Sequence, residues 1–154
     1  MLFKRFLQFV LHFIKKRRLN PKPRISPQQA LGYKGEKFAV QHLKNKGFKV
    51  IARNWRHASG EIDIIASDGP VLVFVEVKAR SQSSGNAAYY AVNKKKKESL
   101  RKACVQYLKS LKVKPKHYRF DVIEVGLMAN KAYTIQHHSG VPLFSKYFFV
   151  AAKS

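Results

Sequence analysis

Three ionisable residues stand inside otherwise apolar segments, and their types could support chemistry at a shared site. Glu76 and Lys78 interrupt the segment VLVFVEVKA, and Asp63 interrupts the segment EIDIIA. Burying an isolated carboxylate or ammonium group is costly unless it is paired or binds a metal ion. Of the 8 Asp and Glu residues in the chain, five fall within residues 36–76, so the acids are concentrated around these segments.

The two segments have the β-branched and aromatic composition of strands, and Asp68-Gly69 between them is a hairpin turn signal. Alternate residues of a strand point to the same face, so Glu76 and Lys78 should project together. If the turn makes the strands antiparallel neighbours, Asp63 can converge with Glu76. We assign Asp68 to the turn rather than to the site.

The same alternation applies to the first of these strands. Glu61 and Asp63 should share one face, with Ile62 and Ile64 on the opposite face. Glu61 stands at the entry of the strand. Glu61 is therefore either an acid that supports the metal ligands without contacting the metal ion, or a plain surface carboxylate.

Two carboxylates with access to water would bind a hard cation such as Mg²⁺ or Mn²⁺, leaving coordination positions for a phosphate oxygen and a water. Such a site hydrolyses phosphodiesters by generating a metal-bound nucleophile and offsetting the charge that develops on phosphorus. Lys78 would orient or deprotonate the water, or stabilise the transition state as a cation. The competing interpretation is an exposed edge strand on which Glu76 and Lys78 form a solvated pair.

A helix must precede these strands. Ser26, Pro27 and Gln29 form a helix-start signal, and Gly47 supplies the conformation common just beyond a helix end. The predicted helix runs to about Lys46. Glu36 lies on its largely apolar face and should point inward.

The remaining elements complete a small α/β protein. Strands are predicted at 48–53, 61–66 and 71–79, followed by an amphipathic helix from about Asn93 to Val113. A further strand is predicted at 117–125, and residues 131–137 could add a last one. The order helix, three strands, helix, strand indicates a single α/β domain with a central sheet flanked by helices.

The charge balance indicates a polyanionic partner. Lys and Arg total 31, which gives a formal net charge of +23, and nucleic acid is the expected partner. The residues expected to bind nucleic-acid phosphates beside the metal site are Arg80, Lys94, Lys95, Lys96, Lys97 and Arg101. An ordinary solvated lysine-rich face is the alternative for any one of them.

The single cysteine, Cys104, excludes an internal disulfide and a zinc ribbon and fits a cytoplasmic location. His137 and His138 are not a metal pair on spacing alone, because adjacent strand residues point to opposite faces. An internal ion pair is the simplest account of Asp121.

Residues 1–25 form a basic, apolar extension that ends in a linker containing prolines. Within it, residues 2–18 are too short and too charged for a membrane span. They form either an interfacial helix on an anionic membrane surface, a helix packed on the protein, or an arm that touches nucleic acid. The domain itself is expected at 26–154.

Three segments together resemble the YraN-like family of bacterial proteins: GYKGEKFAVQHL at 32–43, GEIDII at 60–65 and VFVEVKAR at 73–80. That family belongs to the restriction-endonuclease-like superfamily, whose motif is an acid, a spacer, then Glu or Asp-x-Lys. The resemblance implies a mixed sheet flanked by helices, with Asp63 and Glu76 as metal ligands, Lys78 as the catalytic lysine and Glu36 as the helix carboxylate near the metal.

The superfamily includes Holliday-junction resolvases. The resemblance therefore implies a magnesium-dependent endonuclease that hydrolyses DNA phosphodiester bonds, in branched or otherwise structured DNA. The alternative is a non-catalytic nucleic-acid-binding module that keeps this fold, with or without association to a membrane surface through its N-terminus. Neither the sequence nor the resemblance defines the oligomeric state.

Overall fold

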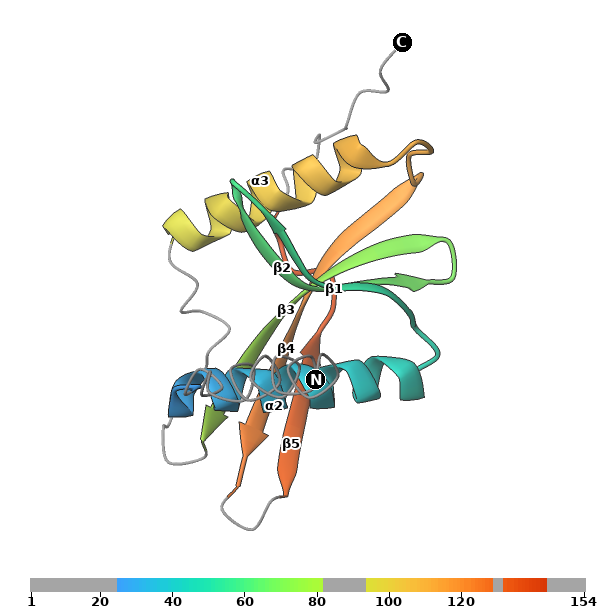
Figure 1. The fold of residues 1–154 in the computed structure, drawn as a ribbon. Coiled ribbons are helices and arrows are strands. Elements are labelled where there is room, and N and C mark those ends of the chain that lie inside the picture. The colour runs from blue at the N-terminus through green and yellow to red at the C-terminus, as the bar shows by residue number, and fades with distance from the viewer. Residues whose placement is uncertain (1–24, 82–93, 129–131, 144–154) are drawn as a thin grey trace, which may run out of the picture.

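A computed structural model describes residues 25–81, 94–128 and 132–143 of the chain (Figure 1). The predicted membrane-surface segment at 2–18 lies outside these ranges, as does most of the predicted linker. The elements, in chain order, are α2 (Pro27–Asn45), β1 (Lys49–His57), β2 (Gly60–Asp68), β3 (Val71–Ser81), α3 (Lys94–Ser110), β4 (His117–Leu127) and β5 (Tyr133–His138). No helix within these ranges is long and apolar enough to cross a membrane.

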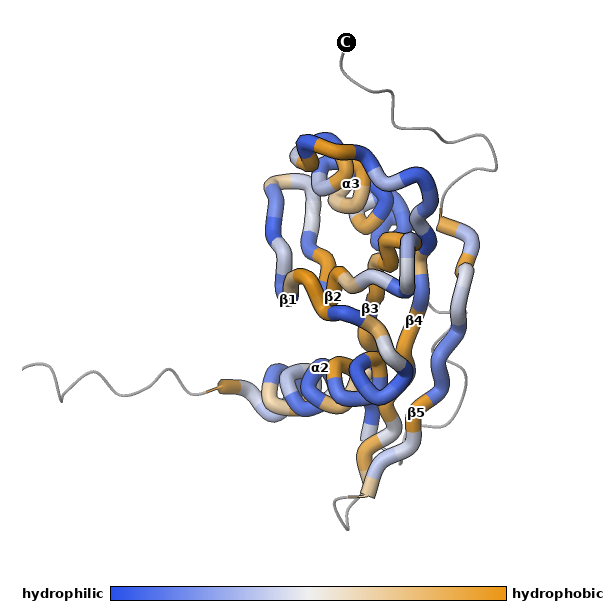
Figure 2. Tube along the Cα trace, turned by 90° about the vertical axis from the view of Figure 1, so that its right-hand side faces the viewer, coloured by the Kyte–Doolittle hydropathy of each residue, from blue (hydrophilic) through white to orange (hydrophobic). Residues whose placement is uncertain are grey.

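The strands form one mixed sheet in the order β1-β2-β3-β4-β5. Neighbours pair antiparallel except β3 and β4, which are parallel and are joined by the crossover that contains α3. The two helices lie on opposite sides of the sheet (Figure 2), and the hydrophobic residues concentrate in the strands between them. The predicted α/β class, with a mixed sheet flanked by helices, is confirmed.

Each helix covers its own apolar cluster. On the α3 side, the buried members of the cluster are Ile62, Ile65, Leu72, Phe74, Leu100, Ala103, Cys104, Tyr107, Leu108, Phe120 and Val122. On the α2 side, the buried members are Ala39, Leu43, Ile64, Val73, Val75, Ile123 and Val125. Because β3 contributes to both clusters, any charged side chain on this strand lies near buried apolar groups.

The start of α2 matches the helix signal in the sequence. Ser26 accepts a hydrogen bond from the Gln29 backbone N–H at 3.1 Å, and the Gln29 side chain accepts one from the Ser26 N–H at 2.9 Å. Further along the helix, Gly35 lies directly on β3, and a Cβ there would collide with Ala79. This close approach brings the next residue, Glu36, down to the level of the sheet.

Regular alternation fails in β2, contrary to the prediction. Ile62 packs in the cluster on the α3 side and Ile64 in the cluster on the α2 side, so they do not share a face. The neighbouring strand β1 is irregular here as well, because its register shifts between Val50 and Ala52 and Asn54 has a φ of 49°. Pairing passes from Arg53↔Ile64 to Trp55↔Ile62, so Asn54 lies opposite Asp63 and interrupts the pleat there.

The hairpin between β2 and β3 also differs slightly from the predicted turn. Asp68 is the last residue of β2, and the two connecting residues are Gly69, with a φ of 54°, and Pro70. The Asp68 carboxylate accepts a hydrogen bond from Arg119 on β4 at 3.0 Å. Asp68 therefore lies at the end of β2, beside the turn to which it was assigned, and is bonded to β4.

Candidate active site

The candidate site lies where β2 separates from β3. Their ladder pairs Ile64 with Val75 and ends there, although continuing the register would place Asp63 opposite Glu76. Instead, Asp63 Oδ2 accepts a hydrogen bond from the Val77 backbone N–H at 2.7 Å. A side chain thus takes the place of a backbone carbonyl, and this contact fixes the Asp63 carboxylate beside β3.

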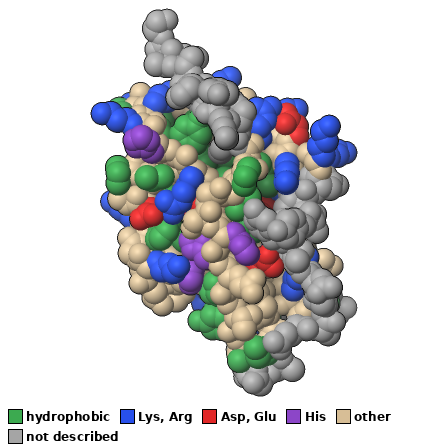
Figure 3. All heavy atoms as spheres, turned by 180° about the vertical axis from the view of Figure 1, so that it is seen from behind, with side chains coloured by type: hydrophobic (Ala, Val, Ile, Leu, Met, Phe, Trp, Pro, Cys, Tyr) green, Lys and Arg blue, Asp and Glu red, His purple; other side chains and the backbone are tan. Residues whose placement is uncertain are grey.

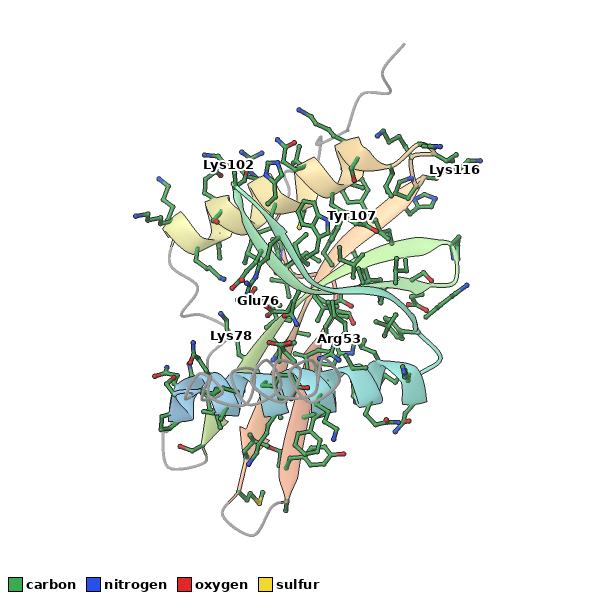
Figure 4. All side chains as sticks on the ribbon, in the orientation of Figure 1. Arg53, Glu76, Lys78, Lys102, Tyr107 and Lys116 are labelled. Carbon is green, nitrogen blue, oxygen red and sulfur yellow. The ribbon has the colours of Figure 1, made fainter. Side chains whose placement is uncertain are left out.

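Glu76 is the most deeply buried carboxylate of the site, with 3% of the residue exposed. Its Oε1 lies 2.6 Å from the Lys78 Nζ and 3.4 Å from the Lys96 Nζ. Its Oε2 is buried and has no hydrogen-bond partner among the residues that the structure describes. Figure 4 shows Glu76 and Lys78 on β3 between the two helices, with Lys78 nearer α2. One oxygen of Glu76 is thus left to bind something else.

Asp63 is held in an environment that opposes its negative charge. Burial, followed by the charge of Glu76, raises the pKa of Asp63 to about 7. The charge of Glu36 adds to this effect, while the hydrogen bond from Val77 and the charge of Lys96 oppose it. A further positive charge next to Asp63 would therefore stabilise its ionised carboxylate and lower its pKa.

Glu36 reaches the same region from α2. It is partly buried, with 19% of its side chain exposed, and its Oε2 lies 3.8 Å from a guanidinium nitrogen of Arg53 on β1. That oxygen also has no hydrogen-bond partner within the described part of the chain. The side chain borders an open hollow of about 700 Å³, whose other lining residues are Ile25, Gln29, Gly32, Tyr33, Asn54 and Arg56. A second carboxylate with an unsatisfied oxygen therefore lies near Asp63, beside a surface that solvent reaches.

The predicted basic surface divides into two parts. Lys96 turns toward the sheet and contacts Glu76, whereas Lys94, Lys95 and Lys97 are exposed. These three line a second hollow, of about 570 Å³, together with Glu98, Arg101 and Leu143. Arg101 is held in place by two hydrogen bonds to Glu98, at 2.8 and 3.0 Å.

Lys96 was predicted to bind phosphate together with these lysines, and the structure places it against Glu76 at the candidate site. Helical spacing does not separate Lys96 from Lys97, because these residues lie four and three positions before the buried Leu100. Arg80, the remaining basic residue predicted to contact nucleic acid, is partly buried near the end of β3. Arg53, which neighbours Glu36, was not predicted and carries no sequence signal of its own.

The carboxylates fit a hard divalent cation of the kind that needs few protein ligands. No group of three or more His, Cys, Asp or Glu residues in the described ranges is arranged to hold a metal ion. Mg²⁺, however, usually retains several waters and binds through one or two carboxylates plus substrate phosphates. Asp63 and Glu76 could supply these two carboxylates. Burial and the charge of Glu76 disfavour the ionised form of Asp63, and Glu76 Oε2 has no hydrogen-bond partner among the described residues.

A second charged cluster lies on β4 and β5. Asp121 is fully buried and is bound by Arg119 at 3.0 Å and by His137 at 3.0 Å. Its Oδ1 also accepts a hydrogen bond from the Gly140 N–H at 2.9 Å. These contacts hold the pKa of the Asp121 carboxyl below its usual value despite burial. The predicted internal ion pair of Asp121 is confirmed.

The fold is consistent with the restriction-endonuclease-like class, in which a mixed sheet lies between helices. Comparison with known sequences identifies the family to which the chain belongs. It belongs to the uncharacterised protein family UPF0102, which matches residues 35–125. This result confirms the YraN-like resemblance.

Relatives of the same family are similar over most of their length. A UPF0102 protein of Alkaliphilus oremlandii is 45% identical over 109 residues, which cover 70% of this chain and 92% of the relative. A UPF0102 protein of Carboxydothermus hydrogenoformans is 39% identical over 114 residues, covering 74% and 96%. The matched family region contains Glu36, Asp63, Glu76 and Lys78.

Proposed function

We propose that this protein is a metal-dependent nuclease that hydrolyses DNA phosphodiester bonds. The observation that carries the proposal is the meeting of Asp63 and Glu76 where β2 and β3 separate, with the pKa of Asp63 raised to about 7 and the Oε2 of Glu76 unsatisfied. Two such groups are costly to keep buried unless a cation compensates them. A cation site beside a strongly basic surface supports chemistry on a phosphate.

Asp63 and Glu76 would hold the metal ion, for which Mg²⁺ and Mn²⁺ are the candidates. When bound, such an ion supplies Lewis acidity and makes a water nucleophilic near neutral pH. The protein prepares the Asp63 carboxylate for this role by fixing its Oδ2 on the Val77 N–H, which limits its rotation. Glu36 lies near enough to influence the charge of Asp63 and would bind the outer waters of the ion.

Lys78 would act on the reacting phosphate. In the structure its ammonium group is held 2.6 Å from Glu76 Oε1, so it is fixed at the edge of the site rather than free in solvent. A fixed cation there offsets negative charge that develops on phosphorus, or orients the attacking water. Lys96, at 3.4 Å from the same oxygen, would move to a substrate phosphate once Glu76 binds a metal ion.

The exposed lysines of α3 would hold the DNA backbone. Lys94, Lys95 and Lys97 line one hollow with Arg101, and the net charge of the chain is +23. Contacts of this kind give affinity without sequence information. They support a substrate recognised by its structure, such as branched DNA.

A second candidate function has one observation in its favour. Lys78 and Lys96 already offset the charge of Glu76 without a metal ion, which a non-catalytic DNA-binding module would also need. Such a module would bind DNA with strong salt dependence but would take up no cation at Asp63 and Glu76. For either function, residues 2–18 would add association with an anionic membrane surface, and deleting them should then abolish binding to anionic liposomes.

The deciding experiment is a cleavage screen with the full chain over linear, single-stranded, flap and four-way DNA. With Mg²⁺ or Mn²⁺ present we expect cleavage of at least one structured substrate, and none in EDTA. Asp63→Asn and Glu76→Gln should each abolish it, whereas Glu61→Gln should not. Cleavage that survives both active-site substitutions would rule out the assignment, and DNA binding without any cleavage would favour the binding module.

A further inference from the structure

A pair of histidines lies apart from the carboxylate site. His42, near the end of α2, and His137, on the edge strand β5, have ring nitrogens 3.4 Å apart, Nε2 of the first facing Nδ1 of the second. His137 is nearly buried, with 5% of its side chain exposed. Figure 3 shows histidine side chains gathered near the middle of the face seen from behind. The pair lies 95 residues apart in the sequence, so it is the fold that creates it.

Asp121 determines which nitrogen of His137 is available. The Nε2 of His137 lies 3.0 Å from Asp121 Oδ2, and a carboxylate can only accept, so this nitrogen donates. The neutral ring then carries its lone pair on Nδ1, which faces His42. A carboxylate that orients an imidazole in this way is the usual support of a histidine that ligates zinc. The Nδ1 lone pair of His137 is thus oriented toward His42, where it could coordinate a metal ion.

The separation of the two nitrogens matches a tetrahedral ion. Two nitrogens that are each about 2.0–2.1 Å from zinc, at a tetrahedral angle, lie about 3.4 Å apart. The observed 3.4 Å is long for a direct hydrogen bond between them. His42 also meets the charge requirement of a ligand, since burial, the charge of Lys46 and His137 all lower the pKa of His42. The lowered pKa favours the neutral His42 ring, which is the form that binds metals.

We propose that His42 and His137 form a binding site for a transition-metal ion, with Zn²⁺ as the preferred occupant, held between their facing nitrogens with Asp121 orienting His137. The ion would join the end of α2 to the edge strand β5. The two remaining coordination positions would be filled by water, because no third ligating side chain within the described residues completes a cluster there. Imidazole nitrogen favours zinc over magnesium, so this site is chemically distinct from the two carboxylates.

The test is calorimetric titration of the full chain with Zn²⁺ in excess Mg²⁺, which would compete with Zn²⁺ for Asp63 and Glu76. We expect His42→Gln and His137→Gln each to weaken binding at least tenfold. His138→Gln is the matched control, because His138 is the next residue on β5 and contacts Glu124 instead, at 3.2 Å. Lys46→Gln should strengthen binding several-fold, because a positive charge near His42 is removed.

A spectroscopic readout keeps the proposal testable if His137→Gln does not fold. In the wild-type protein, Zn²⁺ should shift the ¹⁵N resonances of His42 Nε2 and His137 Nδ1 together, at one equivalent. Binding that is equally tight in His42→Gln, or shifts confined to other histidines, would overturn the proposal. Because the nuclease proposal rests on Asp63 and Glu76, failure of this test would leave that proposal unaffected.

Discussion

Asp63 is joined to Val77 by a hydrogen bond of 2.7 Å from the backbone N–H to the carboxylate, across the gap at which β2 leaves β3. The Asp63 side chain thus pairs with β3 in place of a backbone carbonyl. It lies close enough to Glu76, the residue before Val77, for the two charges to interact. Because the ladder ends at Ile64↔Val75, the carboxylate lies at an opening in the sheet rather than within it. The fold thus creates a polar site without adding a loop.

Replacing Asp63 by Asn should stabilise the metal-free protein at pH 8. The pKa of Asp63 rises from its ordinary 3.8 to about 7 on folding, so the folded state loses stability as pH rises from about 4 to about 7. Asn removes that charge and can still accept from the Val77 N–H. We expect a gain of about 1–3 kcal/mol in the free energy of unfolding at pH 8 and much less at pH 4. Urea denaturation at both pH values measures it, and a loss of stability at pH 8 would contradict the site's electrostatics.

Binding of Mg²⁺ should depend on pH through the same group. Below pH 7 Asp63 is mostly protonated in the metal-free protein and must lose its proton to bind a cation. Affinity should therefore rise about tenfold from pH 6 to pH 8. The rise in melting temperature at fixed Mg²⁺ concentration reports it, since a ligand of the folded state stabilises by mass action. Asp63→Asn is the control and should show neither the shift nor its pH dependence.

Lys96 and Lys97 are adjacent and should respond differently to substitution by Gln. Lys96 competes with a metal ion for Glu76, so Lys96→Gln should strengthen Mn²⁺ binding several-fold. Lys97 is exposed on the second hollow, so Lys97→Gln should weaken DNA binding and lower the salt dependence by about one counterion. Calorimetry and a salt series of DNA binding separate the two. Identical behaviour of both variants would show that Lys96 does not belong to the site.

The close contact between α2 and β3 should make Gly35 sensitive to any side chain. Gly35→Ala forces a Cβ against Ala79, and we expect a loss of about 1–3 kcal/mol in the free energy of unfolding. Gly32 lies one turn earlier and has nothing near its Cβ position, so Gly32→Ala should be neutral or stabilise by up to about 1 kcal/mol. Thermal denaturation of the pair measures the difference. Equal effects would mean that the helix does not rest on β3 at Gly35.

The order of the elements and the hairpin that aligns the acids could be predicted because they depend on local signals. Apolar, β-branched segments and a Gly turn indicate the strand pair, and extending its antiparallel register beyond Ile64↔Val75 would place Asp63 opposite Glu76. Ser26 and Gln29 likewise define the start of α2 by contacts within one turn. These features need no knowledge of the tertiary fold.

The features that were missed depend on contacts between distant segments. The alternation in β2 fails at Asp63, which lies opposite Asn54, a residue of the neighbouring strand with a positive φ. The His42 and His137 pair arises only because β5 passes beside the end of α2. The ion pair of Arg53 and Glu36 likewise forms only because β1 lies beside α2. No spacing within one segment indicates any of these neighbours.

The most direct test of the central claim is whether Asp63 and Glu76 share one cation. Titration of the full chain with Mn²⁺ at pH 8 should give one binding event at this site that is lost in both Asp63→Asn and Glu76→Gln and retained in Glu61→Gln, whose carboxylate is exposed and paired with Arg56. Binding of Mn²⁺ that persists unchanged in either of the first two variants would show that the two carboxylates do not act together. The account of hydrolysis at this site would then be wrong.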